Sequence, residues 1–198
     1  MSLPQNFSEN DTVTPGSSTL RRQGCAWTRI SLYLMGPLGV LAALWITAGR
    51  SLFGAGGSLV PVFAISFGPA LAVLYLLATY YAWQEVKLQR AGVSAGLPLV
   101  TALVQVVGWL LAAVFGLLVP DRVDGVTVSA ASALLGHDLV GLSAGFGNTA
   151  GILTFAFAIA VLLLTLASRR KAKEAARGID DDVREQLERQ ESMYDFLD

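Results

Sequence analysis

Residues 148–168 read NTAGILTFAFAIAVLLLTLAS, and Arg169, Arg170 and Lys171 follow them directly. The run holds no charged side chain and is longer than the roughly 18 apolar residues that indicate a transmembrane helix. Its continuous apolar part, Ile159–Leu166, lacks the alternation of a membrane β-barrel strand. Lipid cannot hydrogen-bond a backbone amide, so a segment that crosses a bilayer is either a strand of a closed β-barrel or a helix. We interpret 148–168 as a membrane-spanning helix with a basic stop signal.

Three further stretches, 31–49, 60–83 and 97–120, have the same character. Arg50 is followed by no charged residue until Glu85, and Arg90 by none until Asp121. Only 15% of the 198 residues are charged, against about 25% in a typical soluble domain. The sequence therefore predicts an all-α fold, an integral membrane four-helix bundle surrounded by lipid.

Basic residues are distributed unevenly between the segments that join these spans. Ten lie before the first span, between the second and third, or after the fourth: Arg21, Arg22, Arg29, Lys87, Arg90, Arg169, Arg170, Lys171, Lys173 and Arg177. The two other loops hold only Arg50 and Arg122. Because cytoplasmic loops carry an excess of Lys and Arg, both ends of the chain are expected in the cytoplasm. Arginine outnumbers lysine eleven to three, which favours a bacterial plasma membrane.

The chain divides into a polar N-terminal tail (1–28), a transmembrane domain (29–168) and a C-terminal tail (169–198). The C-terminal tail starts basic and turns acidic, and residues 182–196 have the apolar spacing of a cytoplasmic amphipathic helix. This helix gains stability if it docks on a protein partner or on the inner face of the protein itself, and a solvated, frayed tail is the alternative. The candidate docking residues are Val183, Leu187, Tyr194, Phe196 and Leu197.

No Asp, Glu, Lys, Arg or His occurs inside the four spans, which disfavours a proton-coupled carrier. Gln105 is the one strongly polar side chain near the middle of a span, and Trp109 follows it by one helical turn. A pair lining a solute cavity is one interpretation. The favoured one is packing, with Gln105 hydrogen-bonded to a neighbouring helix and Trp109 filling space beside it.

Glycine and proline suggest where helices bend or approach each other. Pro37 and Pro69 lie inside spans and each removes a helix hydrogen bond, so a kink is expected at both. The pairs Gly141/Gly145 and Gly147/Gly151 have the small-xxx-small spacing that lets another helix come close. That helix belongs either to the same bundle, which is favoured, or to another subunit. A third interpretation makes 141–148 a re-entrant stretch lining a cavity.

The outer segment 121–147 carries Asp121, Asp124, His137 and Asp138. One histidine with scattered carboxylates is a poor metal site, and no nucleophile–base arrangement accompanies it. No catalytic residue, metal or cofactor is therefore assigned, and an enzyme is not expected. Val126–Leu135 is apolar and small, and is expected as a short helix along the outer membrane surface. The net charge of −1 also disfavours a nucleic-acid partner.

These observations favour a non-catalytic membrane protein, an accessory or scaffold subunit of a larger membrane assembly. Its expected partners are the lipid bilayer and a membrane protein or further copies of itself, with a cytoplasmic protein at the C-terminal helix. The alternative is a homo-oligomeric channel or permease for an uncharged solute, suggested by Gln105, the two prolines and the glycines. A membrane enzyme or sensor with its chemistry at the outer segment is the third hypothesis.

Overall fold

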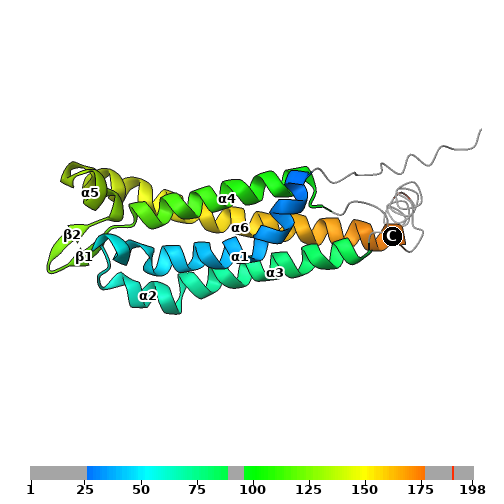
Figure 1. The fold of residues 1–198 in the computed structure, drawn as a ribbon, viewed down its shortest axis with the longest axis horizontal. Helices are drawn as coiled ribbons and strands as arrows, with labels where there is room; N and C mark the ends of the chain where they lie inside the picture. Colours follow the sequence, from blue (N-terminus) through cyan, green and yellow to red (C-terminus); the bar gives the residue numbers. More distant parts are fainter. Residues whose placement is uncertain (1–25, 89–95, 177–188, 190–198) are drawn as a thin grey trace, which may run out of the picture.

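Four long helices lie side by side in the computed structural model, which describes residues 26–88, 96–176 and 189 (Figure 1). They are α1 (Ala26–Ala48), α3 (Phe67–Leu88), α4 (Leu99–Leu118) and α6 (Val140–Ala176). Together with the short elements that extend α1 and α3, they form four segments long and apolar enough to cross a membrane. The predicted all-α four-helix bundle is confirmed, and the chain is a multi-pass integral membrane protein.

The bundle is closed, because each long helix packs against two neighbours in the cyclic order α1, α3, α6, α4. Glycines allow the closest approaches. A Cβ atom on Gly39 of α1 would lie 2.5 Å from Cβ of Tyr75 on α3. A Cβ on Gly116 of α4 would lie 2.4 Å from Nε1 of Trp45, whose indole N–H donates to the Ala113 carbonyl at 3.1 Å. Small residues at these contacts are what helix association in lipid requires.

The second span is broken near its N-terminal end. Helix α2 (Leu59–Ile65) stops before Ser66, and α3 starts at Phe67. Pro69 has no N–H to bond the carbonyl four residues earlier, which belongs to Ile65. The kink expected at Pro69 is thus confirmed as a break. Pro37 lies within the unbroken α1, and in Figure 1 the dark-blue start of α1 runs obliquely to its cyan part.

Short elements cover one end of the bundle (Figure 1). The 3-10 helix η1 (Gly49–Phe53) follows α1, and an antiparallel hairpin of β1 (Asp121–Val123) and β2 (Val126–Val128) follows α4. Helices α5 (Ala130–Leu135) and η2 (His137–Leu139) then lead into α6. We call this end the outer end, following the topology expected from the basic residues.

The helix expected over Val126–Leu135 is wrong in its first part, since β2 occupies Val126–Val128. The reason is the turn Asp124-Gly125, whose φ angles of 51° and 83° belong to the two-residue hairpin turn that an Asp-Gly pair favours. Helix α5 starts only after Ser129, which caps it: the Ser129 hydroxyl accepts the N–H of Ser132 at 3.0 Å.

The fourth span is longer than 148–168, because α6 begins at Val140 and continues to Ala176. Residues 141–148 are therefore helical, and the re-entrant interpretation is wrong. The expected amphipathic helix at 182–196, with all five of its candidate docking residues, lies outside the described residues except for Arg189. Residues 1–25 of the N-terminal tail also lie outside them.

Candidate functional site

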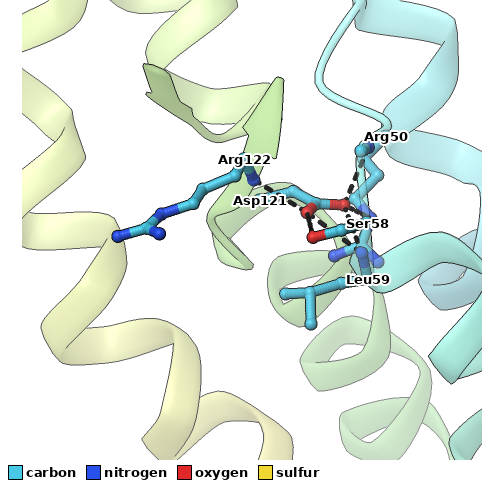
Figure 2. Close-up of polar contacts among 6 residues, drawn as sticks. Arg50, Ser58, Leu59, Asp121 and Arg122 are labelled. Carbon is cyan, nitrogen blue, oxygen red and sulfur yellow. Dashed lines mark hydrogen bonds and ion pairs between the residues drawn. The ribbon is translucent and has the colours of Figure 1, made fainter. Parts of the chain in front are cut away.

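A buried carboxylate, Asp121, organises the outer end (Figure 2). It is 2% exposed and opens β1, immediately after α4 and Pro120. Its oxygens accept the backbone N–H groups of Gly57 at 2.8 Å, Leu59 at 3.1 Å and Arg122 at 2.7 Å. The Ser58 hydroxyl donates to the same carboxylate at 3.4 Å. Asp121 thereby ties the hairpin to the loop that starts α2.

Arg50 supplies the opposite charge from the end of the first span. Its Nε lies 3.7 Å from Oδ2 of Asp121, and both side chains are almost fully buried. The guanidinium carbon lies 4.7 Å from the centre of the Phe63 ring, a cation–π distance. Within the described residues, none of its three nitrogens has a hydrogen-bond partner. Arg50 is thus held by an ion pair and an aromatic face.

The pKa of Asp121 is lowered from its ordinary value of 3.8. Burial alone acts to raise it, because a carboxylate loses hydration. The N–H groups of Leu59, Gly57 and Arg122 and the charge of Arg50 favour the ionised form and together outweigh burial. The carboxylate is consequently a permanent anion at neutral pH, suited to holding structure and unsuited to accepting a proton from a substrate.

Arg50 and Asp121 belong to different outer loops, and no pattern in the sequence pairs them. One signal was available: the glycine at 57. A Cβ on Gly57 would lie 2.0 Å from the Arg122 carbonyl oxygen, so only glycine lets the two loops meet here. Sequence spacing gives no means to identify which loop this glycine approaches.

The middle of the bundle holds the polar residue that the sequence singled out. Gln105 on α4 is fully buried, and neither atom of its amide has a hydrogen-bond partner in the described chain. The bond expected from Gln105 to a neighbouring helix is therefore not found. Nε1 of Trp109 and the hydroxyl of Tyr75 on α3 are also buried without a partner. The hydroxyl would lie 3.0 Å from a Cβ on Gly108, so α3 presents its polar group to the same stretch of α4.

The two glycine pairs of α6 have different surroundings. A Cβ on Gly147 would lie 3.1 Å from the Leu118 carbonyl, and one on Gly151 would lie 2.7 Å from the Phe115 ring. This pair brings α6 close to α4 within the bundle. At Gly141 and Gly145 nothing lies within 4 Å, so this face of α6 is open.

An apolar groove of about 690 Å³ opens between α2 and α6. Four aromatic rings line it: Phe63, Phe67, Phe115 and Phe155. Their ring centres follow one another at 5.9 Å (Phe63 to Phe115), 4.9 Å (Phe63 to Phe67) and 5.8 Å (Phe67 to Phe155). The groove lies beside the break at Ser66: α3 packs along α6, whereas α2 does not pack extensively against it.

The remaining outer polar groups do not gather around one point. Asp124 occupies the hairpin turn, and Asp138 lies exposed in η2. Among the described residues, no group of three or more His, Cys, Asp or Glu side chains is arranged to hold a metal ion. The buried anion of this end is Asp121, which accepts hydrogen bonds from four groups of the protein and forms an ion pair with Arg50.

Comparison of the chain with protein-family models, with curated proteins and with solved structures finds no match.

Proposed function

We propose that this protein is a non-catalytic accessory or scaffold subunit of a larger membrane assembly. The observation that carries the proposal is the open face of α6 at Gly141 and Gly145, where no atom of the described chain fills the space beside the helix. In lipid, apolar surface alone does not drive helices together, whereas a small-xxx-small face permits close backbone contact. A partner helix can therefore come closer to this face of α6 than to a face covered with branched side chains.

The outer-end geometry supports the same proposal. Asp121 is fully engaged by backbone N–H groups and Arg50, so it joins loops and is not available as an acid or base. Such a fixed cap holds the start of α6 in a defined position through the hairpin and α5. A scaffold subunit needs that rigidity at a surface that another subunit contacts.

Replacing Gly141 and Gly145 together with leucine tests the proposal. The doubly substituted protein should recover fewer partner proteins than the wild type after gentle detergent extraction of native membranes. Ala167→Leu is the matched control, because Ala167 is an exposed small residue elsewhere on α6. Removal of 178–198 tests the cytoplasmic docking contact in the same assay. Recovery of the wild type as a lone monomer would contradict an accessory role.

We further propose a bacterial plasma membrane with both termini in the cytoplasm. The basis is the distribution of basic residues, ten on one side of the spans against two on the other. Single cysteines introduced at Ser51 and at Lys171 in a Cys25→Ser background should react differently with an impermeant thiol reagent added to whole cells. Ser51 should be labelled from outside, and Lys171 only after lysis.

A channel or permease for an uncharged solute is the second candidate. It is favoured by the polar groups of Tyr75, Gln105 and Trp109, which are buried and have no hydrogen-bond partner in the described part of the chain. Hydroxyl, amide and indole N–H groups at membrane depth offer the neutral hydrogen bonds that a polyol or a small amide would need. Purified protein in liposomes should then pass such a solute faster than empty liposomes, and Gln105→Leu should slow it. Equal flux with and without protein would exclude this candidate.

A further inference from the structure

The side chains that line the groove between α2 and α6 are apolar along most of its length. Asn148 is the one side chain in that lining with hydrogen-bonding atoms, and it lies with Pro120 toward the outer end. The groove is built from helices that cross the membrane. Its occupant must therefore be apolar inside the bilayer and carry any polar group at the outer surface.

An arginine extends from the segment beside this outer end. Arg122 follows Pro120 by two residues, and its side chain is exposed. In a strand, successive side chains point to opposite faces, and Figure 2 shows the Arg122 guanidinium directed away from the Asp121 carboxylate, on the side where the pale-yellow ribbon of α6 lies. Within the described residues Arg122 has no ion-pair partner, since Asp121 is engaged by Arg50 and the backbone.

A guanidinium in this position suits a phosphate, which it binds with two parallel hydrogen bonds. We propose that the groove binds one glycerophospholipid, with an acyl chain along the four phenylalanine rings and its phosphate on Arg122. Arg50 has a positioning role, because its guanidinium carbon lies 4.7 Å from the centre of the Phe63 ring and restrains that ring. This inference goes beyond the accessory role proposed above: the lipid occupies the groove, whereas the partner helix contacts Gly141 and Gly145, which do not line the groove.

The headgroup contact decides whether such a lipid is retained. Lipid tails are as apolar as the side chains of the groove, so moving a chain from bilayer into groove gains packing but little hydrophobic free energy. The phosphate–Arg122 contact distinguishes a bound lipid from the lipids that surround any membrane helix. A charge reversal at Arg122 should consequently weaken retention more than any apolar substitution of similar size outside the groove.

The test uses the full chain, stripped of lipid in detergent and incubated with dioleoyl phosphatidylglycerol or with dioleoylglycerol, which has the same chains and no phosphate. Native mass spectrometry should find about one phosphatidylglycerol per chain, retained about tenfold better than dioleoylglycerol, which corresponds to ~1.4 kcal/mol. Arg122→Glu should abolish that preference, and Ala156→Trp, which fills the groove, should reduce retention of both lipids. Arg170→Glu and Ala167→Trp, both at exposed sites of α6 outside the groove lining, should behave like the wild type.

Equal retention of the two lipids, or an Arg122→Glu protein that keeps phosphatidylglycerol as the wild type does, would overturn the proposal. A delipidated dimer that Ala156→Trp converts to monomer would also overturn it, because a second copy would then occupy the groove. Arg122→Glu changes an exposed side chain and leaves the bundle intact, so the test does not depend on whether Ala156→Trp folds. Loss of partner proteins from the variant substituted at Gly141 and Gly145 would concern the accessory role only. It would not change how the two lipid-retention measurements are interpreted.

Discussion

Nε of Arg50 lies 3.7 Å from Oδ2 of Asp121, across the outer end of a bundle whose predicted spans contain no Asp, Glu, Lys, Arg or His. The two side chains come from the end of the first span and the start of the hairpin after the third. A buried pair of this kind contributes little net stability by itself, because both ions lose their hydration. Removal of one partner is strongly destabilising, because the other charge then remains buried without a counter-charge.

Asp121→Asn should therefore destabilise the protein by about 3 kcal/mol. The substitution keeps the shape of the side chain but leaves the Arg50 cation without its counter-charge. Thermal unfolding in detergent, followed by circular dichroism, measures the effect. Asp138→Asn is the control, since Asp138 is exposed and should change the midpoint little. The double substitution Arg50→Met with Asp121→Asn should recover part of the loss, and a double variant as unstable as Asp121→Asn would argue against the ion pair.

The lowered pKa of Asp121 predicts an acid-sensitive stability. In the unfolded chain the carboxyl titrates near its ordinary value of 3.8, and in the folded protein below it. The ionised form therefore stabilises the fold above the unfolded pKa, and this contribution is lost as the pH falls through the folded pKa. The contribution of Asp121 should be constant above about pH 5 and should decline below pH 3.8. The unfolding midpoint measured from pH 7 to 3 should show this decline in wild type and much less of it in Asp121→Asn.

Gly39, inside α1, and Gly141, in the first turn of α6, should respond oppositely to alanine. At Gly39 the added Cβ would meet Cβ of Tyr75 at 2.5 Å, an atom close to the backbone that cannot move aside. Gly39→Ala should destabilise the bundle by about 1–3 kcal/mol through overpacking between α1 and α3. At Gly141 nothing lies within 4 Å, and alanine is a better helix former than glycine, by about 1 kcal/mol inside a helix and by less in a first turn. Gly141→Ala should leave the purified monomer as stable as the wild type or slightly more stable, and equal losses at both sites would contradict the packing described here.

Much of the architecture could be predicted because the bilayer imposes it residue by residue. The absence of charge marks each span, and Pro69 marks the break in the second one. The hairpin was missed, although its Asp124-Gly125 turn has a local signal, because the apolar residues that follow also suit a helix. The Arg50–Asp121 pair could not be predicted, since it depends on which loops meet in space. Likewise, no periodicity distinguishes Gly141, which is open, from Gly151, which contacts the Phe115 ring.

Gln105 provides a prediction that separates packing from solute binding. Its buried amide has no hydrogen-bond partner in the described chain, so an apolar side chain of similar length removes the cost of burying an unsatisfied group and loses no bond. Gln105→Met should raise the thermal unfolding midpoint, by a free energy of about 1 kcal/mol. Tyr75→Phe, which removes only the buried hydroxyl, should also raise the unfolding midpoint.

If the amide of Gln105 binds a neutral solute, Gln105→Met should also lower solute flux in liposomes while it stabilises the fold. Groups kept for binding are commonly retained at the expense of stability. A lower midpoint for Gln105→Met would mean that the amide is already satisfied inside the bundle, and that neither the solute interpretation nor the unpartnered geometry is correct.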